Sequence, residues 1–166
     1  TDDDRPTLSV SSPTVTEGVD PYAVFTVSLS NASTSDVSFS LALANGTALG
    51  GGGDYGTGGA GNLQVFNGVS WVDAASATIA AGQTSVQVRT PISNDLLDEV
   101  SETFTLTATR TSGTTVNASA AGTGTMTAGR RAASPRERRP AGPPVVARGR
   151  SQRRCGRQGH RLGRSS

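Results

Sequence analysis

Four stretches of the chain alternate apolar and polar side chains with a period of two residues. They are Tyr22–Ser30, Asp36–Ala44, Ser85–Ile92 and Thr103–Thr109. Successive side chains of a β-strand point to opposite faces, so this period collects the apolar residues on one face of a sheet. An amphipathic helix would instead need apolar residues about every 3.6 positions. The alternation therefore predicts half-buried strands and restricts the fold to the all-β class.

Shorter strands and regular turn signals complete this pattern. Further strands are expected near Leu8–Val10, Leu63–Phe66, Ser70–Val72 and Ala77–Ile79, with a last strand over Ala120–Thr127. Glycine, proline and asparagine separate these stretches, as turns require. About seven short strands spaced in this way are typical of an antiparallel, immunoglobulin-like β-sandwich. We predict this fold for the body of the chain.

The charge of the chain changes sign sharply after Thr127. The whole sequence carries 15 arginines, no lysine and 13 acids, for a net charge of +2. Residues 1–127 hold 12 of the acids and 3 of the arginines, a net charge of −9. Residues 128–166 hold 12 arginines and one acid, a net charge of +11. The near-neutral average therefore describes two unlike segments, and the basic pI does not by itself indicate a nucleic-acid partner.

The basic segment is expected to be a disordered tail. It has no aromatic residue, and its only aliphatic side chains larger than alanine are Val145, Val146 and Leu162. So little apolar surface cannot offset the entropy cost of folding. We therefore divide the chain into residues 1–5, which end a preceding unit or linker, a folded body over 6–127, and the tail over 128–166.

Two interpretations of the tail remain open. An arginine-rich segment can bind nucleic acid or another polyanion. The tail can also be a frameshifted reading of GC-rich DNA, because arginine without lysine fits GC-rich codons. In the neighbouring reading frame, the codons for Gly129-Arg130-Arg131 can encode Asp-Asp. We favour the frameshift, and we expect no nucleic-acid partner.

The composition of the body excludes several kinds of active site. Residues 1–127 contain no His, Cys or Lys, since His160 and Cys155 both lie in the tail. Neither a Ser-His-Asp or Cys-His nucleophile, nor a Cys/His zinc site, nor a Schiff-base lysine can be built there. No apolar stretch is long enough to cross a bilayer, so no direct membrane insertion is expected. We predict that the protein is not an enzyme, and that carboxylates, hydroxyls, amides and carbonyls supply its chemistry.

Four short motifs follow one another along the body. Val15-Thr-Glu-Gly18 comes after the first strand, and Gly53-Asp-Tyr55 lies in a glycine-rich loop. Ala81–Ser85 precedes one long strand, and Asn94–Phe104 leads into another. In this order the motifs resemble a Calx-β domain, and more narrowly the Calx-β-like repeats of large bacterial surface and RTX-type adhesins. The resemblance covers about residues 6–127 and implies an immunoglobulin-like sandwich that binds calcium.

The resemblance also implies which residues bind the ion. The matching positions are Glu17, Asp54, Asp95, Glu99 and Glu102. Asp98 stands where the family more often has an apolar residue, so its role stays open. Calcium takes six to eight hard oxygen ligands in tolerant geometry, which such a set of carboxylates can begin to supply.

Both ends of the matched region bear on this site. Family repeats typically finish with Gly-Thr-Gly-Thr-Ile-Thr followed by three aspartates. Here Gly122–Thr127 supplies the first part, but Ala128 and Gly129 replace the aspartates. Asp2, Asp3 and Asp4 look like the end of a preceding repeat, and the resemblance implies that they would bind a calcium ion at the junction with it.

The resemblance implies a non-catalytic, calcium-binding structural repeat of a large secreted or cell-surface bacterial protein. Its partners would be neighbouring repeats of the same parent chain. Calcium would stiffen this string of repeats, which would act as an extender that holds an adhesive domain away from the cell. The cell-surface or matrix ligand of that parent is not identified. One alternative is a carbohydrate-binding sandwich that uses Trp71 and Tyr55 as an aromatic platform. Nucleic-acid or polyanion binding through the tail is the other.

Overall fold

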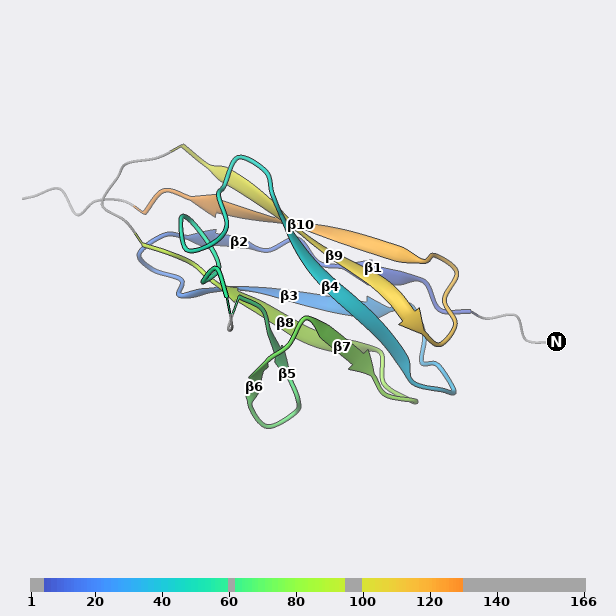
Figure 1. Cartoon of the computed structure of the whole chain (residues 1–166). Helices are drawn as coiled ribbons and strands as arrows, with labels where there is room; N and C mark the ends of the chain where they lie inside the picture. The colour runs from blue at the N-terminus through green and yellow to red at the C-terminus, as the bar shows by residue number, and fades with distance from the viewer. Residues whose placement is uncertain (1–4, 60–61, 95–99, 130–166) are drawn as a thin grey trace, which may run out of the picture. The chain divides into compact units, whose positions relative to one another are not determined.

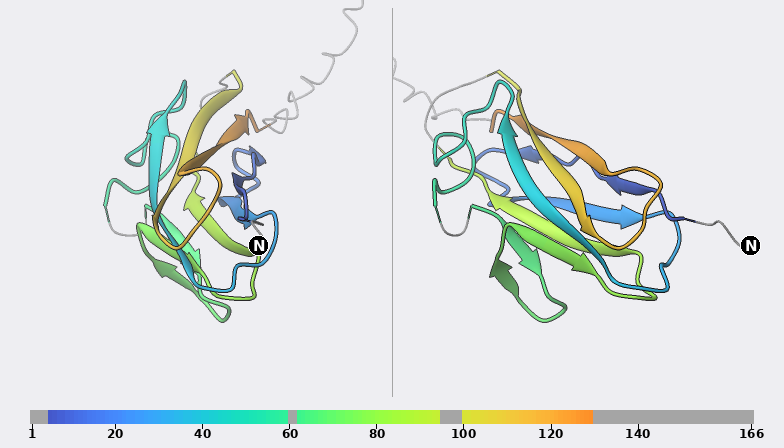
Figure 2. Two further views of the ribbon diagram at one scale, coloured as in Figure 1. Left: turned by 90° about the vertical axis from the view of Figure 1, so that its right-hand side faces the viewer. Right: turned by 45° about the vertical axis from the view of Figure 1, so that its right-hand side comes forward.

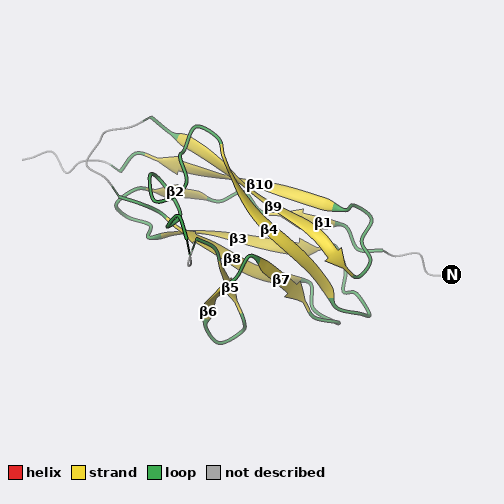
Figure 3. Ribbon diagram, viewed as in Figure 1, coloured by secondary structure: helices red, strands yellow, loops and turns green. Residues whose placement is uncertain are grey.

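The computed structural model describes residues 5–59, 62–94 and 100–129. Internal contacts divide the chain into two units, Thr1–Ala132 and Ala133–Ser166, and the second unit lies wholly outside the described residues. The described part of the first unit contains ten strands and no helix (Figures 1 and 3). No described segment is therefore a helix long and apolar enough to cross a membrane. The expected disorder of the tail stays a prediction.

The strands form two five-stranded sheets that pack face to face as a β-sandwich (Figure 2). The first sheet has the order β1-β3-β8-β5-β6, with bounds Leu8–Val10, Tyr22–Leu29, Ser85–Pro91, Gln64–Phe66 and Trp71–Asp73. The second has the order β2-β10-β9-β4-β7, with bounds Thr14–Thr16, Ser119–Thr127, Glu102–Ser112, Val37–Asn45 and Ser76–Ile79. The predicted immunoglobulin-like sandwich is confirmed.

The core lies between the sheets and consists largely of the apolar side chains that alternate along the long strands. Its fully buried members include Phe25 and Val27 of β3, Phe39 of β4, Val88 of β8 and Phe104 of β9. The intervening residues of these strands face outward, as the period of two requires. The hydrophobic effect therefore fixes the register, because a shift by one residue would expose every one of these side chains.

One strand, β2, was not expected from the sequence. It contains three residues, of which only Val15 is apolar, so it is too short to show an alternation. The chain leaves the first sheet after Val10 and joins the second sheet at Thr14. There β2 runs parallel to β10, with Thr16 paired to Thr127. The described residues therefore form ten strands, one more than the nine stretches named from the sequence and more than the roughly seven of the predicted sandwich. One pair also departs from the expected antiparallel arrangement.

Two glycines of β10 allow close approaches that a side chain would block. A Cβ atom on Gly124 would lie 2.6 Å from the ring of Phe104, and one on Gly122 would overlap the carbonyl oxygen of Ser11. The Gly-Thr-Gly-Thr sequence therefore serves packing in this molecule. It makes room for the central phenylalanine of the core and for the segment that crosses from β1 to β2.

A row of stacked side chains crosses the outer face of the first sheet. The guanidinium of Arg89 on β8 lies 3.7 Å from the ring centre of Tyr22 and 4.3 Å from that of Trp71. The ring of Trp71 in turn packs against Phe66 at 5.3 Å between centroids. Arg89 also donates from Nε to Oε1 of Gln64 at 2.8 Å. This cation–π row ties the short β5–β6 hairpin to the long strands β3 and β8.

Replacing Arg89 by alanine is expected to lower the free energy of unfolding by roughly 1–2 kcal/mol, because two cation–π contacts are lost together. Arg89→Lys should restore part of this loss, since lysine keeps the charge but not the flat stacking surface. Urea unfolding followed by circular dichroism measures both values. Arg110→Ala is the matched control, because Arg110 donates two long hydrogen bonds of 3.4 and 3.5 Å. Equal losses at the two arginines would contradict a special role of the stack.

Candidate metal site

The candidate site lies at the end of the sandwich where the described chain finishes, which we call the C-terminal pole. Its described parts are the β2–β3 turn, the start of the β4–β5 loop, residues 92–94 after β8, residues 100–101 before β9, and Ala128 and Gly129 after β10. Strand pairing brings these segments together, because Thr16 lies beside Thr127 and Met126 lies beside Glu102. Figure 3 shows that loops from both sheets gather at this end.

Glu17 is the most buried acid of the pole, with 7% of its surface exposed. It follows β2 directly, and its side chain lies on the same inward side as Val15, two residues earlier. Its backbone N–H donates to the carbonyl oxygen of Thr127 at 3.1 Å. Gly129 packs against the carbonyl of Glu17 so closely that a Cβ atom there would overlap it. The chain therefore holds Glu17 firmly between the two sheets.

Glu102 begins β9 on the far side of β10 from Glu17. It precedes Phe104 by two residues, so its side chain also lies on the inward side of the sheet. Its Oε2 atom is buried and accepts no hydrogen bond from the described residues, although the residue makes other interactions. Two strand spacings and an offset of two residues along β10 separate the backbones at Glu17 and Glu102, a distance of roughly 12 Å. Two inward carboxylates therefore share one pole, and oxygen ligands of this kind suit calcium.

Asp54 is placed differently from these two glutamates. Its Oδ2 atom accepts a hydrogen bond from the backbone N–H of Leu49 at 2.7 Å, which closes its own loop. Its carbonyl oxygen accepts from the N–H of Ser93 at 2.9 Å, which ties this loop to the segment after β8. One carboxylate oxygen of Asp54 is therefore engaged locally. The aspartate joins two loops of the pole, but it is not directed wholly at an ion.

The remaining predicted ligands lie outside the described residues. These are Asp95, Asp98 and Glu99 between β8 and β9, and Asp2, Asp3 and Asp4 before β1. Among the residues that the structure describes, no three or more His, Cys, Asp or Glu side chains are grouped closely enough to hold a metal. The structure thus brings Glu17 and Glu102 to one pole, while the assignment of the other ligands stays a prediction.

Asp20 was not among the predicted ligands, yet it organises the same pole. Its Oδ2 atom accepts from the N–H of Thr16 at 2.8 Å, and its own N–H donates to the carbonyl of Thr16 at 2.9 Å. These two bonds close the turn that carries Glu17. Asp20 stands three residues after Glu17 and directly before Pro21. This position is the signal that could have identified Asp20 as a turn residue. A small cavity of about 220 Å³ opens beside this turn.

The aromatic platform proposed as an alternative does not form with Tyr55. The Tyr55 side chain is 2% exposed and stacks on Phe104 with ring centroids 4.2 Å apart. Its hydroxyl donates to Oδ1 of Asn45 at 2.6 Å. Trp71 is half-buried, and Arg89 covers one part of its ring while Phe66 packs against another. The prediction that Tyr55 offers a ring face to a sugar is therefore wrong, because the core takes up that ring.

Burial raises the pKa of Tyr55 above its ordinary value near 10, and the neighbouring Asp54 carboxylate raises it further. The folded state thus holds the phenol proton more tightly than the unfolded state. This contribution to stability is fully present below about pH 10 and is lost as the pH rises through the folded pKa. Between about pH 9 and 11, we expect the free energy of unfolding to fall more steeply for the natural chain than for Tyr55→Phe. Parallel declines in the two proteins would contradict this assignment.

Comparisons with known proteins place the fold. No family model and no curated protein sequence matches the chain. Similar solved structures are the calcium binding domain CBD12 of CALX1.1 and CBD12 from CALX1.2, at TM-scores of 0.53 each and identities of 14% and 15%. Another is the apo-form Calx CBD1 domain, at a TM-score of 0.51 and 15% identity.

The extent of these matches differs. They cover 73%, 75% and 74% of this chain, but 44% of each CBD12 structure and 97% of the CBD1 domain. The chain therefore spans less than half the length of the two CBD12 structures and nearly all of the single domain. At these identities the likeness establishes the fold alone, which is Calx-β-like as the motifs implied. The narrower resemblance to bacterial adhesin repeats stays a prediction.

Proposed function

We propose that this chain is a non-catalytic, calcium-binding β-sandwich whose ion binds at the C-terminal pole. The observation that carries the proposal is the placement of Glu17 and Glu102, two acids that point inward between the sheets at the same end. Carboxylate oxygens are the hard ligands that calcium prefers, and a divalent cation between the two side chains would offset their negative charge. The likeness to structures named as calcium binding domains supports the choice of ion.

The remaining ligands would come from the segment between β8 and β9. Asp95 and Glu99, with Asp98 as a further acid, belong to the same connection as Glu102. Asp54 would contribute from the neighbouring loop through the oxygen that does not accept from Leu49. Backbone carbonyls and water would complete the six to eight oxygens that calcium requires. No aspartates follow Thr127, so we expect weak binding, in the range of extracellular calcium modules, about 10⁻⁴–10⁻³ M.

A mechanical role as an extender fits the positions at which the chain enters and leaves the sandwich. Pro6 lies beside Val116, near the beginning of β10, because its carbonyl accepts from the N–H of Val116 at 3.0 Å. Thr127 ends β10, whose nine residues span roughly 30 Å. Figure 1 shows β10 running along the length of the sandwich. Sandwiches joined in tandem would therefore stack end to end. We propose that calcium at each pole stiffens such a string in a secreted or cell-surface protein.

Thermal unfolding with and without calcium tests the binding proposal. With 10 mM calcium against excess chelator, we expect the melting temperature to rise by several degrees, since an ion that binds only the folded state stabilises it. Magnesium at the same concentration should give a much smaller shift, because it demands tighter octahedral geometry. Equal shifts with both ions would indicate general screening of a chain segment of charge −9. No shift would contradict the proposal.

A further inference from the structure

Two of the six asparagines of the chain are followed by glycine, at Asn45-Gly46 and at Asn67-Gly68. Such a pair can lose ammonia, because the backbone nitrogen of the glycine can attack Cγ of the asparagine and close a five-membered succinimide ring. Glycine has no side chain to hinder this approach. The two pairs are identical in sequence, but the structure places them in different surroundings.

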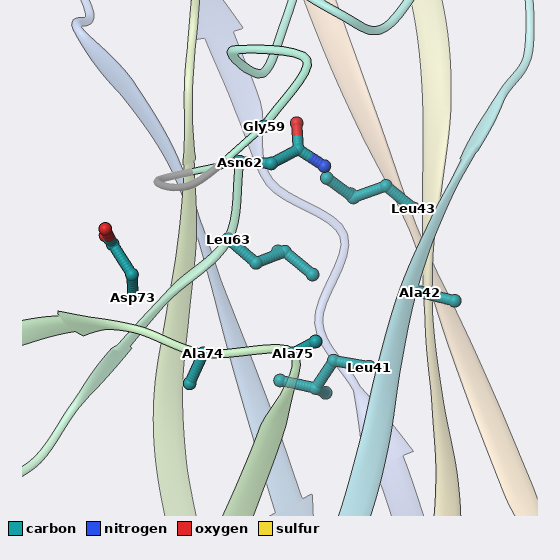
Figure 4. Close-up of a pocket in the computed structure, with 9 residues that line it drawn as sticks. All are labelled: Leu41, Ala42, Leu43, Gly59, Asn62, Leu63, Asp73, Ala74 and Ala75. Atoms are coloured by element: carbon teal, nitrogen blue, oxygen red, sulfur yellow. The ribbon is translucent and has the colours of Figure 1, made fainter.

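The other four asparagines are followed by a residue with a side chain. Asn62 is an example, because it precedes Leu63, whose buried side chain lines a hollow between the strands (Figure 4). An attack by the nitrogen of Leu63 on Asn62 would pull this side chain out of the core. The two Asn-Gly pairs are therefore the candidate sites for ring closure.

Asn67 and Gly68 lie at the exposed tip of the β5–β6 hairpin. Oδ1 of Asn67 accepts from the backbone N–H of Val69 at 3.0 Å and from that of Ser70 at 2.8 Å. These two donors polarise the Cγ–Oδ1 bond, and they would stabilise the negative charge that develops on Oδ1 when a nucleophile adds to Cγ. The turn therefore places a small oxyanion hole around the side chain of Asn67.

The attacking nitrogen belongs to Gly68, and little restrains it. Its N–H donates to no described residue. Gly68 has a φ of 94°, and a Cβ atom placed on it would meet no atom within 4 Å beyond its chain neighbours. No described residue accepts from Nδ2 of Asn67, so ammonia can leave directly into solvent. The tip of the hairpin can therefore rotate into the geometry of attack without a clash.

Asn45 also has a polarised side chain, since Oδ1 accepts from the N–H of Gly50 at 2.9 Å and from the hydroxyl of Tyr55 at 2.6 Å. Its backbone is held differently. Asn45 is the last residue of β4 and pairs with β9, and a Cβ atom on Gly46 would overlap the carbonyl oxygen of Thr103. Ring closure requires rotation about the Cα–C bond of the asparagine. The end of β4 must therefore open before Asn45 can react.

We propose that Asn67 is a site of spontaneous deamidation, which the folded hairpin permits while the end of β4 suppresses the same reaction at Asn45. Hydroxide takes the proton of the Gly68 nitrogen, which bonds to Cγ of Asn67. The Cγ–Nδ2 bond then breaks, and Nδ2 takes a proton from water and leaves as ammonia. Water next adds to one of the two ring carbonyls. Opening at Cγ gives aspartate, and opening at the main-chain carbonyl gives isoaspartate.

Both products change the hairpin. Each adds one negative charge at its tip, and isoaspartate also adds a methylene group to the main chain between Phe66 and Trp71. These two residues pair across the hairpin, and their ring centroids lie 5.3 Å apart. Trp71 is the one tryptophan of the chain. Its fluorescence therefore reports a change in the geometry of this loop.

Incubation of the full chain at mildly alkaline pH, followed by chymotrypsin digestion and mass spectrometry, tests the proposal. Cleavage after Phe66 and Trp71 separates Asn67 from the peptide that carries Asn45. In the folded chain we expect the rate at Asn67 to exceed that at Asn45 by roughly tenfold or more, a barrier difference of about 1.4 kcal/mol. In concentrated guanidinium chloride the two rates should become similar, because unfolding removes both surroundings. Excess chelator should leave the rate at Asn67 unchanged, which separates this reaction from calcium binding.

Two variants connect the chemistry to the hairpin. Asn67→Gln is the matched unreactive variant, because its longer side chain would have to close a six-membered ring. Asn67→Asp carries the charge of the products without the added methylene group. Over the same incubation, the emission of Trp71 should shift in the natural chain and stay constant in both variants.

Three results would overturn the proposal. One is an equal rate at Asn67 and Asn45 in the folded chain. Another is a slower reaction at Asn67 in the folded chain than in guanidinium chloride, which would show that the hairpin protects it. The third is an equal shift in the emission of Trp71 in the natural chain and in Asn67→Gln, which would place the change elsewhere.

Discussion

Replacing Phe104 by alanine should lower the free energy of unfolding by about 3–5 kcal/mol, a large part of the stability of a domain of this size. Phe104 is fully buried, stacks on Tyr55 at 4.2 Å and meets the edge of Phe25 at 5.8 Å between ring centroids. Gly124 leaves room for its ring on the neighbouring strand. The truncation would therefore open a cavity at the centre of the sandwich, and urea unfolding measures its cost.

Phe66→Ala is the matched control for this substitution. Phe66 lies on β5, is half-buried and packs against Trp71 on the outer face of the first sheet. The same chemical change there should cost less than half as much, because water can fill the space that is left. Equal losses at the two phenylalanines would contradict the view that the Phe25–Phe104–Tyr55 cluster is the centre of the core.

The double substitution Glu17→Gln and Glu102→Gln should abolish the rise in melting temperature that calcium produces. Calcium at one hundred times its dissociation constant stabilises a protein by about 2.7 kcal/mol, and this contribution would be lost with the ligands. Without calcium, the double variant should still unfold in one cooperative transition, because glutamine keeps the size of glutamate and can still take part in hydrogen bonds. Differential scanning calorimetry with and without calcium checks both expectations.

Asp36→Asn is the control for this pair. Asp36 lies at the opposite end of the sandwich, where Oδ1 accepts from the N–H of Ala81 at 2.9 Å. Its substitution should cost some stability through the weakened turn, but the response to calcium should stay the same. A double variant that still responds to calcium, or an Asp36→Asn variant that does not, would place the ion somewhere other than the C-terminal pole.

The sequence predicts the long strands well because their apolar residues alternate over many positions. Phe25, Phe39 and Phe104 were all expected on inward faces, and all are buried. The pattern could not reveal β2, since three residues with one apolar side chain carry no period, and its pairing with β10 depends on a long-range crossing. The pattern also could not place Arg89 between Tyr22 and Trp71. These residues lie on three separate strands, and they meet only when the sheet has assembled.

The candidate site was predictable in part. The resemblance implies Glu17 and Glu102 as ligands, and strand pairing places both on inward faces of one pole. That they bind the ion stays a prediction. Asp54 was expected to bind the ion, and this assignment stays a prediction. What the sequence could not show is that one of its carboxylate oxygens accepts from the nearby N–H of Leu49, a local contact that aspartates in loops often make. Tyr55 was weighed as an exposed platform, yet an aromatic residue in a glycine-rich loop can still insert into the core.

Isothermal titration of calcium into the full chain, in the presence of millimolar magnesium, tests the central proposal most directly. We expect a saturable heat with at least one ion bound per chain and a dissociation constant of about 10⁻⁴–10⁻³ M. The heat should disappear in the double variant Glu17→Gln and Glu102→Gln and persist in Asp36→Asn. A titration of the natural chain that shows only the heat of dilution up to 10 mM calcium would contradict the account.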